Sequence, residues 1–161
     1  METWPEPVER VAAALRAGGV EARLEAFTEP TPTARDAARA AGCDLAQIVK
    51  SVVFLCDGSP VVALAPGDRR VDAGKVARLA GAAEARVAKP DEVLAATGFE
   101  TGAVAPFPLP NVSRILMERL LLSHEEVWVG AGSRTHLAVL APRDLLRLSK
   151  AEAADVVSAD A

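Results

Sequence analysis

The fold of this chain is organised around one strongly β-forming stretch, Ile48-Val49-Lys50-Ser51-Val52-Val53-Phe54-Leu55-Cys56, which is followed by Asp57-Gly58 and by a second apolar run over 60–65. Val, Ile and Phe favour strands, and Asp-Gly between two such runs is a strong signal for a tight hairpin. The sequence therefore predicts two antiparallel strands, over 49–56 and 60–65.

Helices and strands alternate irregularly on both sides of this hairpin. Apolar spacing and capping residues predict helices over 5–18, 33–42, 72–81, 91–97 and 142–148. Further strands are predicted over 20–27, 84–88, 112–117, 127–129 and 135–140, and Asp44 is expected to cap one extra turn. The alanine-rich tail from Lys150 is expected to fray. We therefore predict an α+β fold, a mixed, strongly curved β-sheet or barrel flanked by helices, in a single domain over 1–161.

The composition limits the class of protein. Half of the 161 residues are apolar, which suffices for a buried core, and the net charge is −4. A mildly acidic chain argues against a broad nucleic-acid surface. A local basic cluster is still present, although ordinary solvated charges would also explain it: Arg69, Arg70, Lys75 and Arg78. Neither a signal segment nor a membrane-spanning run occurs, so a cytoplasmic protein without membrane contact is expected.

Lys50 is the most informative single residue. Alternation along the strand places it on the same face as Val52 and Phe54, while the opposite face is also apolar. An unpaired buried ammonium costs several kcal/mol, so Lys50 needs a carboxylate, a bound anion or an opening to water. The alternative is that Lys50 sits at the end of the strand and reaches solvent along its aliphatic stem.

Two glycine-containing segments could line a site. In the long connection 98–111, Gly102 allows close backbone approach, and loop N–H groups can stabilise a developing oxyanion. A simple crossing loop is the alternative. The segment Gly130-Ala131-Gly132-Ser133 either forms a tight turn between two strands or lines a pocket.

The usual catalytic and metal-binding patterns are missing from the sequence. His124-Glu125-Glu126 lacks the second histidine of a zinc protease motif, and His136 stands alone. No Gly-x-Ser-x-Gly nucleophile motif occurs, and the two cysteines and two histidines lack the spacing of metal ligands. We therefore expect neither a metal nor a cofactor.

Six motifs follow one another along the chain: Phe27 with Thr31-Pro32, 47–54, 67–72, 98–107, Gly130-Ala131-Gly132-Ser133 and 140–146. This ordered set resembles the YbaK/ProX family of trans-editing aminoacyl-tRNA deacylases, which is related to the editing insertion of bacterial prolyl-tRNA synthetases. The resemblance extends from about Val8 to about Leu148.

The resemblance implies hydrolysis of the ester that joins an amino acid to the terminal ribose of a tRNA. It implies that Lys50 holds polar or anionic parts of the substrate, and that N–H groups near Gly102 polarise the ester carbonyl. A ribose hydroxyl of the tRNA would help to activate water. The substrate-binding residues that it implies are Phe27, Thr31, Pro106, Gly132 and Ser133. Lys50 is then expected to open into a cleft bordered by the Gly102 loop. The aminoacylated 3′ end of tRNA is the implied partner, and an aminoacyl-tRNA synthetase is a further candidate.

One departure keeps a second function open. Pro108 stands where many members of the family have glycine, so the loop with Pro106, Pro108 and Pro110 is expected to be stiffer. A non-catalytic module that binds an amino acid or nucleotide in the same pocket is therefore the main alternative. Hydrolysis of another small ester is a third interpretation.

Overall fold

The computed structural model describes residues 3–159. Its helices are α1 (Glu6–Ala17), α2 (Ala34–Ala41), α3 (Ala73–Ala80), α4 (Pro90–Thr97) and α5 (Pro142–Ser149), with 3₁₀ turns η1 (Leu45–Gln47) and η2 (Arg119–Ser123). Its strands are β1 (Ala22–Ala26), β2 (Val49–Cys56), β3 (Ser59–Pro66), β4 (Ala85–Val87), β5 (Arg114–Glu118), β6 (Val127–Gly130), β7 (His136–Leu140) and β8 (Glu152–Ala154). The predicted hairpin, helices and strands are confirmed, whereas η2 and β8 are additional.

Local capping chemistry explains why the helices start where the sequence predicts. The Thr33 hydroxyl accepts the N–H of Asp36 at 3.1 Å at the start of α2, and the Asp72 carboxylate accepts the N–H of Lys75 at 3.1 Å in α3. Gly81 ends α3 in the left-handed conformation with φ of 69°. These contacts span only three or four residues, so they can be read from sequence.

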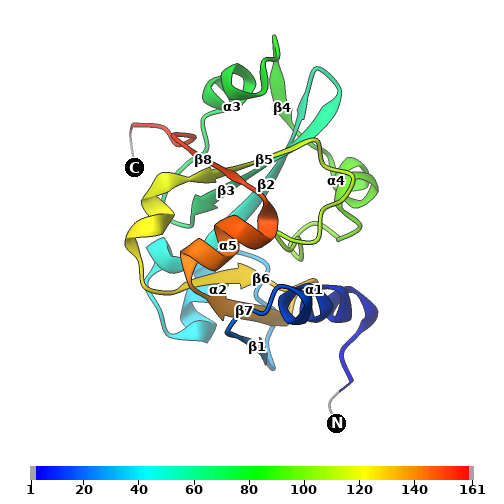
Figure 1. The fold of residues 1–161 in the computed structure, drawn as a ribbon, viewed down its shortest axis with the longest axis vertical. Helices are drawn as coiled ribbons and strands as arrows, with labels where there is room; N and C mark the ends of the chain where they lie inside the picture. The colour runs from blue at the N-terminus through cyan, green and yellow to red at the C-terminus, as the bar shows by residue number, and fades with distance from the viewer. Residues whose placement is uncertain (1–2, 160–161) are drawn as a thin grey trace.

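The strands form two open sheets (Figure 1). One has the order β4-β2-β3-β5-β8, in which β2 pairs antiparallel with β3 and β4, while β5 is parallel to β3 and β8. The other is the antiparallel sheet β1-β7-β6. A parallel bridge between Ile48 and Trp128 connects β2 to β6. The mixed α+β prediction is confirmed, but the barrel alternative is wrong, because β4 and β8 remain as edges of the large sheet.

The main core lies where the two sheets and the helices α1, α4 and α5 meet. Val11, Met117 and Leu145 are fully buried there. The connection between α4 and β5 also enters this core, because Ala105, Phe107 and Leu109 are buried in it at alternate positions. The Gly102 loop is therefore anchored to the core just beyond the glycine.

Residues 150–159 are held by strand pairing and burial, so over this range the fraying predicted from Lys150 is wrong. Strand β8 pairs in parallel with β5, and Val156 and Val157 are buried against the α3 side of the sheet. The Asp72 N–H donates to the carbonyl of Val156 at 2.8 Å, and the Ser158 N–H donates to the carbonyl of Arg70 at 2.8 Å. The burial of these two valines and the main-chain hydrogen bonds stabilise a segment whose alanine-rich composition predicted little order.

Candidate functional site

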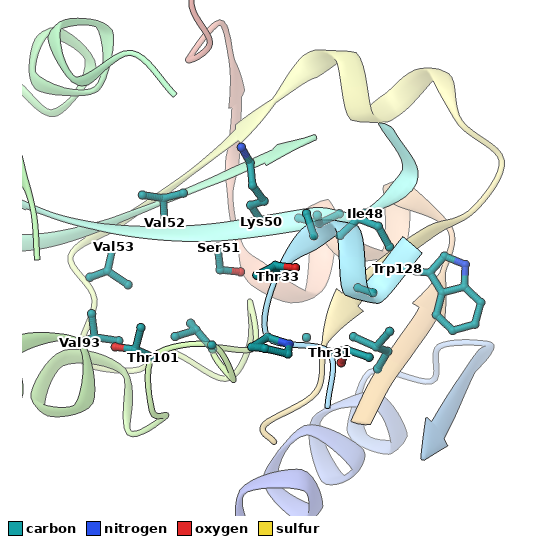
Figure 2. A pocket seen from close by; sticks show the side chains of 18 of the residues that line it. Thr31, Thr33, Ile48, Lys50, Ser51, Val52, Val53, Val93, Thr101 and Trp128 are labelled. Carbon is teal, nitrogen blue, oxygen red and sulfur yellow. The ribbon is translucent and has the colours of Figure 1, made fainter. Parts of the chain in front are cut away.

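A pocket of about 370 Å³ opens beside β2, between the segments around Thr31 and Thr101 (Figure 2). This volume is at the small end of the range for ligand pockets. The lining residues are mostly apolar, and the polar ones are Thr31, Thr33, Lys50, Ser51 and Thr101. Such a space suits a small ligand that has both an apolar part and a polar group.

The lining residues of β2 point to both sides of the strand. Figure 2 shows Ser51 and Val53 on the side of Thr101, whereas Lys50 and Val52 point the opposite way. This alternation is the period-two geometry of a strand. The pocket therefore wraps around the exposed edge of β2, and residues from both of its faces border it.

The Lys50 amine is held on the far side of β2 from Thr101 (Figure 2). It donates a hydrogen bond to the main-chain carbonyl of Arg69. Burial lowers the pKa of Lys50, and the nearby carboxylate of Asp68 opposes that shift. Lys50 and Gly102 line the same pocket, as predicted, but the Lys50 amine points away from the side on which Thr101 lies.

The pocket-facing edge of β2 is only partly paired with β4. The Gly67 N–H donates to the Ile48 carbonyl at 2.7 Å on the β3 side, and the Ala88 N–H donates to the Val53 carbonyl at 2.9 Å on the other side. By the alternation of an antiparallel ladder, the N–H and C=O of Ser51 point to the same side as those of Val53. Strand β4 pairs only with 54–56 and so does not reach Ser51, and β6 is bridged to this chain segment at Ile48. Sequence reasoning missed this edge, although the shortness of the predicted strand 84–88 was a signal for it.

The Gly102 loop forms the opposite rim. Gly102 has φ of +85°, a conformation that favours glycine, and a Cβ there would lie 3.4 Å from Cβ of Pro32. The Ala103 N–H is used by the carbonyl of Glu100 at 2.9 Å. The N–H of Gly102 itself has no acceptor among residues 3–159.

Arg134 ties the two rim segments together, a role that the sequence did not indicate. Its carbonyl accepts the Thr31 N–H at 2.5 Å and the Thr31 hydroxyl at 3.0 Å. Its guanidinium donates to the carbonyl of Thr101 at 3.2 Å. The positions of Thr31 and Thr101 are therefore coupled through a residue that follows β6.

Four of the predicted binding residues lie outside the pocket lining. Phe27 does not line it, but its ring lies 6.5 Å from that of Trp128, which does. Pro106 is buried in the core, and a Cβ on Gly132 would lie 2.6 Å from the carbonyl oxygen of Pro7. Ser133 hydrogen-bonds the Nδ1 atom of His136 at 2.5 Å. From the late glycine turn, the residue that lines the pocket is Gly130.

Acid–base, nucleophilic and metal-binding side chains are scarce at this site. The lining contains no His, Cys, Asp or Glu. Burial is the main cause that raises the pKa of Cys43 and Cys56, which disfavours reactive thiolates, and it lowers the pKa of His136. Within residues 3–159, no group of three or more His, Cys, Asp and Glu side chains is placed to hold a metal ion.

Comparisons with known proteins converge on one family. Residues 28–148 match the model of the aminoacyl-tRNA editing domain. Protein YwhH of Bacillus subtilis (strain 168) is 33% identical over 124 residues, covering 76% of this chain and 78% of the relative. The proline–tRNA ligase of Nitratidesulfovibrio vulgaris (strain DP4) is 35% identical over 112 residues, which are 67% of this chain but only 20% of the ligase.

A solved structure extends the similarity to nearly the whole chain. The crystal structure of a candidate trans-editing enzyme for prolyl tRNA synthetase is 34% identical, with a TM-score of 0.88, and the match covers 97% of this chain and 99% of that one. None of the helices described for this chain has the length and apolar character needed to cross a bilayer.

Proposed function

Because the chain belongs to the aminoacyl-tRNA editing domain family, we propose that it hydrolyses the ester bond of a tRNA carrying the wrong amino acid. The proposal is carried by one observation: the pocket offers polar main-chain groups but no side-chain acid or base besides Lys50, whose amine points away. The reactive groups must then come from the substrate and water, while the protein supplies position and polarisation.

The lining of the pocket supports this reaction. With the amino-acid side chain between Val53, Val93 and Val104, the ester carbonyl would lie near the N–H of Gly102. A free hydroxyl of the terminal ribose orients a water molecule, whose oxygen attacks the carbonyl carbon. The bond from that carbon to the ribose oxygen then breaks, and the ribose oxygen takes up a proton. The products are a free amino acid and an uncharged tRNA.

Discrimination between amino acids comes from the volume of this apolar space. One methylene group more or less in a hydrophobic pocket changes transition-state binding by about 1–3 kcal/mol. The small pocket volume of about 370 Å³ therefore favours small amino acids as the ones removed.

The direct test is a panel of tRNAs, each charged with one small non-cognate amino acid. We expect turnover of at least one of them, with kcat/KM strongly reduced in Lys50→Ala and retained in Lys89→Ala. Lys89 is exposed and outside the pocket, so it controls for loss of a positive charge. Absence of turnover across the panel by well-folded protein would reject the proposal. Saturable calorimetric binding without turnover would instead support the non-catalytic binding module.

A further inference from the structure

A second, larger cleft lies on the side of β2 toward which Lys50 points. It has a volume of about 1210 Å³ and lies between the start of α2, the strand β2 and the segment 67–74. Lys50 and Val52 line both this cleft and the smaller pocket, as do Thr33 and Ala34. The two spaces thus adjoin at β2, and one extended ligand can occupy both.

The second cleft is rich in cations that have no carboxylate partner. Its lining includes Arg35, Lys50, Arg69 and Arg70, and none of these forms an ion pair with a carboxylate of residues 3–159. Several cations elsewhere are paired, for example Arg86 with Glu92 at 2.8 Å. The chain as a whole carries a net charge of −4, so this concentration of unpaired positive charge is local.

The carboxylates of the cleft do not cancel this charge. Asp68 and Asp72 are the acidic residues in its lining, and Asp72 is already engaged as the cap of α3. The Arg69 side chain adds an unused donor, because its Nε atom is buried without a hydrogen-bond partner. Its Nη2 atom donates at 3.4 Å to the carbonyl of Ser158. The guanidinium of Arg69, which lines the cleft, thus keeps hydrogen-bonding capacity that no carboxylate of residues 3–159 uses.

We propose that this second cleft binds the phosphodiester backbone at the unpaired 3′ end of the tRNA while the aminoacyl group occupies the smaller pocket. This assignment rests on the proposed function. It places the aminoacyl group on one side of β2 and the phosphates on the other. Apolar walls on one side select the amino acid, and arginine side chains on the other hold phosphates regardless of base identity. Lys50, which stands at the boundary, faces the nucleotide side.

The test compares two substrates that differ in their phosphates. One is aminoacyl-tRNA and the other is the same amino acid esterified to adenosine, which has no phosphate. Arg35→Ala and Arg70→Ala are each expected to raise KM for the tRNA about five- to tenfold, with little change in kcat. The KM for aminoacyl-adenosine should change much less. Arg143→Ala, an exposed charge on α5 outside both cavities, is the matched control.

Salt dependence gives a second measure. A lost phosphate contact lowers the slope of log KM against log salt concentration by about 0.7 for a single strand. Slopes and KM values for Arg35→Ala and Arg70→Ala equal to those of Arg143→Ala would overturn the assignment while leaving the deacylase proposal intact. If no aminoacyl-tRNA is hydrolysed, anisotropy with labelled uncharged tRNA tests the cleft separately. Weaker binding by the two variants supports it, and unchanged binding overturns it.

Discussion

The ammonium of Lys50 donates a hydrogen bond to the main-chain carbonyl of Arg69, so the loop after β3 fixes where this cation points. That loop is held in turn by the C-terminal segment, because the Ser158 N–H donates to the carbonyl of Arg70 at 2.8 Å. An isolated bridge between Val71 and Val157 continues the same contact. The position of the Lys50 amine therefore depends on residues at the end of the chain.

The titration of Lys50 should reveal its burial. Desolvation is the main cause that lowers the pKa of Lys50 in the folded protein. Between that lowered pKa and the ordinary lysine value of about 10.4, the Lys50 amine is more often protonated in the unfolded chain than in the folded one. The free energy of unfolding is therefore highest, as far as Lys50 is concerned, at pH values above this range. It decreases as the pH falls through the range to the folded pKa. NMR of ¹³C-dimethylated lysines, with Lys50→Ala for assignment, measures the folded value among four lysines.

Asp68→Asn provides the control for this titration. Because the Asp68 carboxylate raises the pKa of Lys50 against the effect of burial, its neutralisation should lower that pKa further. A Lys50 resonance that titrates together with those of exposed lysines in both proteins would contradict the burial of the amine.

Ser158→Pro should loosen the loop that holds Lys50. Proline has no N–H, so the hydrogen bond to the carbonyl of Arg70 is lost, whereas Ser158→Ala keeps it. We expect faster hydrogen exchange in 69–72, and a Lys50 pKa closer to its ordinary value, in the proline variant alone. Identical behaviour of the two variants would show that the C-terminal segment does not position the amine.

Glu118 should be a major contributor to stability. It is buried, and its two carboxylate oxygens accept the N–H groups of Val156 and Leu120, each at 2.9 Å. Glu118→Leu leaves both donors unpaired and should cost about 2–5 kcal/mol of unfolding free energy in urea titrations. Glu118→Gln retains one acceptor and should cost less. Glu125→Gln, at an exposed position, should change the free energy of unfolding little. A Glu118→Leu variant as stable as the unmodified protein would refute the structural role of Glu118.

Gly130→Ala should alter the pocket directly. A Cβ at this position would lie 2.6 Å from the carbonyl oxygen of Val104, so the backbone of the Gly102 loop has to move. We expect a stability loss of about 1–3 kcal/mol and a lower kcat toward aminoacyl-tRNA. Gly19→Ala has a strained positive φ of +62° but open space around the added methyl group. It should lower the melting temperature while kcat stays unchanged, and a similarly unaffected kcat in Gly130→Ala would contradict the pocket assignment.

Local chemistry made most of the secondary structure predictable. The cap of α2 joins residues three apart, and the hairpin turn joins adjacent strands, so nearby sequence contains all the partners. The same local alternation placed Lys50 on a strand and identified it as a costly cation. The order of motifs further indicated the family, which the match over residues 28–148 confirms.

Long-range contacts set the features that the sequence could not reveal. The acceptor of the Lys50 amine is 19 residues away, the partner of Glu118 at Val156 is 38 residues away, and Thr31 meets Arg134 across 103 residues. Packing of Val156 and Val157 against the α3 side of the sheet ordered a tail that its composition predicted to fray. Alternation can place a side chain on one face of a strand. The cavity that this face borders depends on elements that are far apart in the sequence and come together only in the tertiary structure. Their contacts leave no local sequence pattern from which they could be predicted.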